Sequence, residues 1–246
     1  MANTQVGRLI VMALSLKFYQ DAQPHPCPYL SDQKAQNLYP DPALPMSNEI
    51  YSELIQYGFR RSGNSSYRPH CSACQACVPV RINIKQFMLS RSQRRCLKRN
   101  QQLTISHHPA EFNLEHFVLY SRYLNARHAG GGMENPTEES YRNFLLSYWS
   151  HTHFIEFRDG PKLVGLAVTD SVDNALSAFY TFFDPDYGQQ SIGTYAILEQ
   201  INLAKANDFS TLYLGYWIEN CQKMRYKQNF SGLEGYINHQ WQALET

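Results

Sequence analysis

Three strand-forming runs follow one another closely in the C-terminal half of the chain, and they constrain its fold more than any other feature. Residues 153–157, 163–169 and 177–183 are rich in aromatic and aliphatic side chains. Asp159-Gly160 separates the first two runs, and the polar residues 170–174 separate the last two. Short runs separated by such turn sequences are typical of neighbouring antiparallel strands. The sequence therefore predicts a three-stranded antiparallel meander.

Helices are predicted on both sides of this meander. Residues 113–129 form one helix, which three glycines at 130–132 end, and Asn135, Pro136 and Glu138 begin a second helix by capping-box chemistry. A third helix over residues 191–206 precedes a strand over 211–216. The inner stripe of the first helix is predicted to consist of Leu114, Phe117, Val118, Ser121 and Leu124. Helix, helix, three strands, helix, strand is the order of the acyl-CoA N-acyltransferase (GNAT-like) fold, although many α+β domains share it.

The N-terminal half contains shorter elements. Three prolines between residues 21 and 28 exclude a regular helix there. Ser47 is predicted to cap a helix that ends near Gly58, and residues 59–61 and 66–68 flank a hairpin turn. We therefore predict an α+β protein with a small cysteine-bearing, basic domain over residues 1–105 and a GNAT-like domain over residues 106–246.

Charge is distributed unevenly along the chain. No Asp or Glu occurs between Leu54 and Ala110, whereas ten of the 22 Lys and Arg residues do, although the whole chain has a net charge of only +1. Within this segment Ser90 can cap a helix with cations on one face. The alternative is an ordinary solvated helix, but such a helix usually carries both signs of charge, so phosphates are the favoured partners. The predicted cationic stripe consists of Arg91, Arg94, Arg95, Lys98 and Arg99.

Cysteines are concentrated in the same basic segment. Cys71, Cys74 and Cys77 have two overlapping Cys-x-x-Cys spacings, and Cys27 lies in the proline-rich loop. Three thiolates and one further ligand suit tetrahedral zinc or an iron–sulfur cluster. Free thiols are the alternative, because a structural zinc ribbon normally has two separated Cys-x-x-Cys pairs.

Two stretches of the C-terminal half carry residues suited to binding and catalysis. Residues 183–194 run from the end of a predicted strand, through a turn, into the first residues of a predicted helix. Exposed amides at such a helix start can bind an anion or a carbonyl oxygen. Residues 212–227 combine Tyr213 and Tyr216 with the basic cluster Lys223, Arg225 and Lys227. An ordinary helix cap and ordinary packing tyrosines are the simpler alternatives.

Four motifs together resemble the arginyl-tRNA–protein transferase family, and its bacterial branch most closely. The motifs are His70-Cys71-x-x-Cys74-x-x-Cys77-Val78-Pro79-Val80-Arg81, the segment Ser90 to Asn100, Phe183-Asp184-Pro185-Asp186-Tyr187 through Thr194, and Gly215-Tyr216-Trp217-Ile218 through Lys227. The resemblance implies a cysteine-bearing N-terminal domain followed by an acetyltransferase-like domain. It also implies transfer of leucine from leucyl-tRNA to proteins that begin with Asp or Glu, which marks them for degradation. No cofactor is required for this transfer, and zinc or an iron–sulfur cluster carries over from eukaryotic relatives only as an option.

The expected site residues follow from this resemblance and from the chemistry of aminolysis. The reacting ester is expected near Tyr213 and Tyr216, and the incoming ammonium near Asp184 and Asp186. A bidentate arginine suits an acidic first side chain, and the candidates are Arg60, Arg61 and Arg68. The aminoacyl-adenosine end is assigned to Tyr187, Ser191, Gly193 and Thr194, and the tRNA backbone to the cationic stripe together with Lys223 and Lys227.

Three other functions remain open at this stage. Arginyl-tRNA could be the donor, coenzyme A could replace the tRNA, or the protein could bind RNA without catalysis. The apolar residues 9–14 are too few to span a bilayer, so we expect a cytoplasmic protein without a membrane partner.

Overall fold

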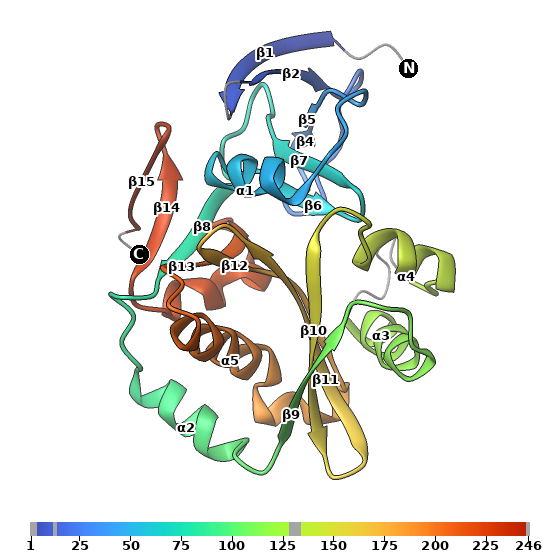
Figure 1. The fold of residues 1–246 in the computed structure, drawn as a ribbon, viewed down its shortest axis with the longest axis vertical. Helices are drawn as coiled ribbons and strands as arrows, with labels where there is room; N and C mark the ends of the chain where they lie inside the picture. Colours follow the sequence, from blue (N-terminus) through green and yellow to red (C-terminus); the bar gives the residue numbers. More distant parts are fainter. Residues whose placement is uncertain (1–3, 12–13, 128–133, 245–246) are drawn as a thin grey trace.

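A large mixed sheet of eight strands lies at the centre of the molecule (Figure 1). The structure is a computed structural model that describes residues 4–11, 14–127 and 134–244. The strands are, in spatial order, β15 (Gln240–Ala243), β14 (Leu233–Ile237), β8 (Val78–Asn83), β13 (Thr211–Trp217), β12 (Ala175–Phe183), β11 (Lys162–Val172), β10 (His151–Asp159) and β9 (Thr104–Pro109). The predicted meander is confirmed, because β10, β11 and β12 pair antiparallel in sequence order.

Helices cover both faces of this sheet (Figure 1). On one face α5 (Ile192–Ala206) and α2 (Arg91–Arg99) bury Ile201 and Cys96 against the sheet. On the other face α3 (Leu114–Arg127) and α4 (Glu138–Leu145) bury Leu124 and Tyr141. The predicted mixed α and β class is therefore confirmed. Within the described residues, no helix is both long and apolar enough to cross a membrane.

A second, five-stranded sheet lies beside one end of the large sheet, with helix α1 (Asn48–Gln56) packed between them (Figure 1). Its strands are, in spatial order, β1 (Thr4–Val11), β2 (Leu14–Gln20), β5 (Asn37–Pro40), β7 (Ser65–Pro69) and β6 (Arg60–Ser62). A small pair, β3 (His25–Pro26) and β4 (Lys34–Ala35), accompanies it. Ser47 caps α1 as predicted, and β6 and β7 form the predicted hairpin.

The buried face of α3 differs from the predicted one. Leu114 and Val118 are 68% and 52% exposed, whereas His116, Leu119 and Tyr120 are buried. The count of apolar residues gave the wrong face because the sheet also accepts His116, which meets Glu156 of β10 at 2.6 Å, and Tyr120. Its predicted glycine stop at residues 130–132 lies outside the described residues. The second predicted helix is capped by Thr137 and Ser140, two residues after the expected start.

Strand β8 joins the N-terminal half of the chain to the large sheet. It pairs with β13 on one side and with β14 on the other, and α2 follows it on the same sheet. The domain boundary predicted after residue 105 therefore passes through this sheet. The division into two domains stays a prediction.

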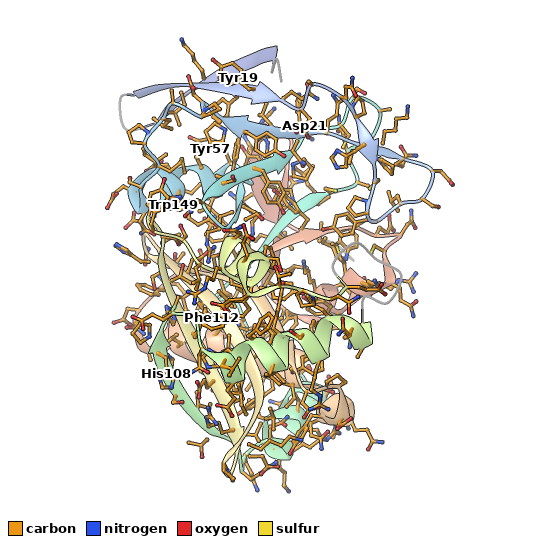
Figure 2. The ribbon with its side chains drawn as sticks, turned by 90° about the vertical axis from the view of Figure 1, so that its right-hand side faces the viewer. Tyr19, Asp21, Tyr57, His108, Phe112 and Trp149 are labelled. Carbon is orange, nitrogen blue, oxygen red and sulfur yellow. The ribbon has the colours of Figure 1, made fainter. Side chains whose placement is uncertain are left out.

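A buried ion pair fastens the small sheet to the large one. Arg61 of β6 binds Asp170 of β11 through two hydrogen bonds of 2.8 and 2.7 Å, and neither side chain is exposed. Gly63, in the hairpin turn, lies so close to α4 that an added Cβ would be 1.9 Å from the Asn143 carbonyl oxygen. Figure 2 shows Trp149 at this junction, where its indole N–H donates to the Asn64 carbonyl at 3.0 Å.

Candidate functional site

The two central strands β12 and β13 separate from each other partway along their length. They pair in parallel only where Ala175–Ser177 meets Thr211–Tyr213. Beyond this point the two strands diverge, and we call this region the splay. Two cations donate hydrogen bonds to backbone carbonyls there, because carbonyls without a partner strand need other donors. Arg60 Nη2 of β6 donates to the Ala178 carbonyl of β12 at 3.1 Å, and Lys227 Nζ donates to the Tyr216 carbonyl of β13.

The local sequence of β13 makes room for these cations. The register of β13 against β8 shifts between Tyr213 and Gly215, and Gly215 has a φ of +80°, which favours glycine. A Cβ at Gly215 would lie 3.6 Å from Nε of Arg60. The bulge therefore brings the backbone of β13 against the guanidinium. We call Arg60 and Lys227 the splay cations.

The splay cations are buried without a negative partner. Each is only 6% exposed, and in the described part of the chain neither forms an ion pair with a carboxylate. Nη1 of Arg60 has no hydrogen-bond partner. Burial, together with the charge of Arg60, lowers the pKa of Lys227 to about 7. Lys227 lies beside Tyr226, with Nζ 5.9 Å from the ring centre, and this tyrosine is 42% exposed.

This placement changes the interpretation of the three candidate arginines. Arg61 is saturated by Asp170, the Leu145 carbonyl and Thr152, so a peptide could reach it only by displacing them. Arg68 donates to the Tyr57 carbonyl at 2.8 Å. Arg60 is the one of the three that retains a buried, unpartnered donor.

The predicted catalytic tyrosines are both buried in the junction of the two sheets. Tyr213 packs in a core cluster and meets the ring of Trp241 at 5.7 Å. Tyr216 donates its hydroxyl to the Gly58 carbonyl at 2.9 Å. Burial raises the pKa of both phenols. Tyr213 therefore packs in the core, and the backbone of Tyr216 belongs to the splay, while the catalytic role of both stays a prediction.

Asp184 lies at the end of β12 and is fully buried. It caps the 3₁₀ helix η1 (Pro185–Gln190) and binds Lys162 at 2.8 Å and Arg122 at 3.0 Å. Burial opposes its ionisation, but Lys162, the Asp186 amide and Arg122 outweigh this and hold the pKa of Asp184 below its ordinary value. Asp186 is exposed and also binds Arg122, at 3.2 Å. Asp184 is thus already paired with two cations, whereas Asp186 is exposed and binds only Arg122, and the contact of these carboxylates with an incoming ammonium stays a prediction.

Sequence reasoning missed Arg122 and Lys162, the two cations that bind Asp184. They lie on α3 and at the start of β11, and only the fold brings them to Asp184. The available signal was Asp184 itself, because an Asp followed by Pro between a strand and a helix is typical of a helix cap.

The cationic stripe lies on α2 as predicted, and all five of its cations are exposed. The helix has the predicted Ser90 cap, with Gln93 completing a capping box. Its C-terminal end is held against the corner of residues 183–194. There Asn100 donates to the Gln190 carbonyl at 2.8 Å, and Arg99 donates to the Gln189 carbonyl. The stripe therefore adjoins Ser191, which has a left-handed φ of +57°. Tyr187, Gly193 and Thr194 of the same corner are half-buried.

The second basic cluster is divided by burial. Lys223 and Arg225 are exposed on the 3₁₀ helix η2 (Gln222–Asn229), but Lys227 faces inward to the splay. Lys227 is buried, so a phosphate backbone outside the protein meets Lys223 and Arg225 first, and the tRNA contact predicted for Lys227 stays a prediction. Gln93 of α2 donates to the Asn229 carbonyl at 3.1 Å, which places the stripe next to η2.

Cys27, Cys71, Cys74 and Cys77 are free thiols of intermediate exposure. Burial, with the charges of Cys71, Cys27 and Cys74, raises the pKa of Cys77 to about 12. The four thiols therefore lie near one another. Among the residues the structure describes, however, no group of three or more His, Cys, Asp or Glu side chains has the arrangement of a metal site. The cysteines in this arrangement do not fit a bound metal, and no step of the chemistry is assigned to one.

Metal analysis provides a direct test of this cluster. We expect purified protein to contain less than stoichiometric zinc and iron, and Cys74→Ser to melt at the wild-type temperature. The measurement is elemental analysis combined with thermal unfolding, before and after a chelator. One equivalent of metal that Cys74→Ser releases, with a loss of stability, would show that the thiols rearrange around an ion.

Comparison with known proteins identifies the family of this chain. Residues 25–95 match the family model "Arginine-tRNA-protein transferase, N terminus", and residues 115–237 match "Arginine-tRNA-protein transferase, C terminus". The chain belongs to the arginine-tRNA-protein transferase family. The two matched regions contain the cysteines of the predicted metal site, the splay cations and residues 91–95 of α2. Membership of this family makes the protein a transferase.

Relatives in this family are similar over almost their whole length. The aspartate/glutamate leucyltransferase of Teredinibacter turnerae is 48% identical over 94% of this chain and 95% of its own. That of Thiobacillus denitrificans is also 48% identical, over 94% and 96%, and that of Nitrosococcus oceani is 49% identical, over 90% and 94%. Among solved structures, L-PGS from Bacillus licheniformis aligns with a TM-score of 0.44 and 9% identity, covering 69% of this chain and 50% of that one. Similarity at this level says nothing about activity.

Proposed function

We propose that this protein transfers leucine from leucyl-tRNA to the N-terminal α-amine of proteins that begin with Asp or Glu. The names of the relatives supply the donor and the acceptors. The observation in this chain that carries the proposal is the combination of an exposed cationic helix with two buried cations at the strand splay. Such an arrangement suits a polyanionic donor outside the protein and an acidic acceptor inside it.

The reaction is an aminolysis of an ester. The α-amine nitrogen attacks the ester carbonyl carbon, a C–N amide bond forms, and the C–O bond to the terminal ribose breaks. The ribose oxygen leaves as a hydroxyl with a proton that the amine loses. An N-terminal amine has a pKa of about 7.7 to 8.0, so a substantial fraction is neutral near physiological pH. Holding amine and ester together can therefore supply most of the rate.

The site proposal places the two substrates on neighbouring surfaces. The tRNA backbone follows α2 with Lys223 and Arg225, and its aminoacyl-adenosine end reaches the corner of Tyr187 and residues 191–194. The acceptor peptide enters at the splay, where Tyr226 is exposed. The backbone amides near the splay, together with Tyr216, are the proposed environment of the reacting ester.

The GNAT-like fold and the cellular role are also proposals. A GNAT-like domain begins with β8, which follows the strands of the small N-terminal sheet in the chain and is itself a strand of the large sheet. The splay between β12 and β13 is the position at which an acyl group would lie in such a domain. Leucylated proteins would then be marked for degradation by the N-degron pathway in the cytoplasm, where aminoacyl-tRNA is made.

A transfer assay distinguishes this function from its alternatives. Labelled leucyl-tRNA, arginyl-tRNA or acetyl-coenzyme A is incubated with the protein and with peptides that begin with Asp, Glu, Asn or Lys. We expect label from leucyl-tRNA on the Asp and Glu peptides alone. Transfer from arginyl-tRNA, acetylation, or tRNA binding without any transfer would each replace the proposal with the corresponding alternative.

A further inference from the structure

In the part of the chain that the structure describes, buried charges are paired except at the two splay cations. Among the described residues that are less than 10% exposed, Asp170 and Asp184 bind cations, and Glu156 binds Arg158 at 2.7 Å and His116 at 2.6 Å. The splay cations have only backbone carbonyls as hydrogen-bond partners. Burying a charge without a counter-charge is costly, and burying two cations together is more so.

The surroundings of the splay cations supply no negative group. Five tyrosines face Arg60, and burial raises the pKa of all five phenols, so they remain neutral: Tyr51, Tyr67, Tyr213, Tyr216 and Tyr226. Cys221, which precedes η2, and Tyr226 face Lys227 and are its other titratable neighbours. No carboxylate of the described residues therefore supplies a counter-charge, and a ligand that enters the splay can bring one.

We infer that Arg60 and Lys227 together form the binding site for one carboxylate, the side chain of the acceptor's first residue. The inference rests on the proposed function. Arg60 offers its unpartnered Nη1, and a lysine ammonium has three donors, of which the Tyr216 carbonyl uses one. An Asn or Gln side chain has the same shape but brings no charge. Discrimination then follows because only a carboxylate compensates the charge of Arg60 and favours the charged form of Lys227.

Proton binding provides a signature of this site. Without an acceptor, Lys227 has a pKa of about 7, because burial and Arg60 disfavour its charged form. A carboxylate beside it favours the charged form and raises that pKa. Above about pH 7, binding of an acidic peptide must therefore take up a proton from solvent. The affinity is highest below this pH and falls as the pH rises.

Calorimetry with acceptor peptides and no aminoacyl-tRNA measures this linkage without turnover. Peptides that begin with Asp or Asn are titrated at about pH 8 in two buffers of different ionisation enthalpy. We expect the wild-type protein to take up a larger fraction of a proton with the Asp peptide than with the Asn peptide, which controls for the α-amine. In Lys227→Met this difference should disappear. Binding of the Asp peptide should weaken about 10- to 100-fold, while binding of the Asn peptide changes little.

Two further variants control the experiment. Lys205→Met removes an exposed lysine from the far end of α5 and should leave both peptides unaffected. Arg60→Gln keeps Lys227 but removes the neighbouring cation. It should raise the pKa of Lys227, reduce the proton uptake and weaken the Asp peptide about tenfold or more. If Lys227→Met does not fold, Arg60→Gln decides the question.

The outcomes separate this inference from the proposed function. If Lys227→Met and Arg60→Gln keep the wild-type preference for Asp over Asn, the carboxylate binds elsewhere and the inference is wrong. Leucine transfer by the wild-type protein would still stand. If the wild-type protein transfers no leucine to any peptide, the proposed function itself fails. Proton-linked binding of the Asp peptide would then remain as a property of the splay cations.

Discussion

Replacing Arg94, Arg95 and Lys98 together with glutamine is expected to weaken tRNA binding about 100-fold or more near 0.1 M salt. These cations are exposed, and α2 has no acidic residue to pair with them. Each lost phosphate contact also removes roughly 0.7 to 0.9 from the slope of log affinity against log salt, so the triple variant should lose a slope of about two to three. Fluorescence anisotropy of labelled tRNA over a salt series measures both quantities.

A matched triple variant tests whether location or net charge causes the effect. Lys17, Lys34 and Lys205 are exposed elsewhere, and changing them to glutamine removes the same charge. This control should keep most of the affinity and of the slope. An equal loss in both triple variants would show that tRNA responds only to overall charge. An unchanged slope in the α2 variant would remove α2 from the tRNA-binding surface.

Replacing Arg61 with methionine is expected to lower the free energy of unfolding by about 3 to 5 kcal/mol, because Asp170 would be left buried without its partner. Asp170 has no exposed side-chain surface, and besides Arg61 it accepts a hydrogen bond only from Thr152, at 2.8 Å. The guanidinium also lies 3.9 Å from the ring centre of Phe179, and methionine keeps part of that packing. Urea unfolding followed by circular dichroism gives the difference directly.

Adding Asp170→Asn to this variant provides the control. Neutralising the stranded carboxylate should restore a large part of the stability, whereas the two single changes added together would predict a further loss. A stable Arg61→Met protein that no longer distinguishes Asp from Asn peptides would contradict our interpretation. Arg61 would then bind the acceptor, as its position in the sequence first suggested.

Local patterns in the sequence predict much of this fold. The meander, α1, the β6–β7 hairpin and the capped α2 all depend on residues close together in the chain, so the sequence contains their signals in a few positions. The face of α3 is harder, because its inner surface includes His116, whose imidazole is buried against Glu156 of β10. A polar residue that finds a distant partner is invisible to an apolar count.

The candidate site is even harder to predict from local patterns in the sequence. Arg60 and Arg61 are adjacent arginines of one strand, and the alternation of side chains sends them to different partners. Arg61 meets Asp170, whereas Arg60 enters the splay beside Lys227. Nothing local distinguishes a guanidinium with a counter-charge from one without it. The same reason hides the burial of Lys227 among the exposed Lys223 and Arg225.

The position of β8 has a consequence for synthesis of the protein on the ribosome. Arg81 of β8 pairs with Tyr213 of β13 and Glu234 of β14, about 130 to 150 residues later in the chain. At a translation rate of about 5 to 20 residues per second, β8 waits roughly 7 to 30 s for its neighbours. During this interval both of its edges lack their final partners, so the nascent chain offers an open template for strand pairing. A stop codon before β14 would make that exposure permanent on one side.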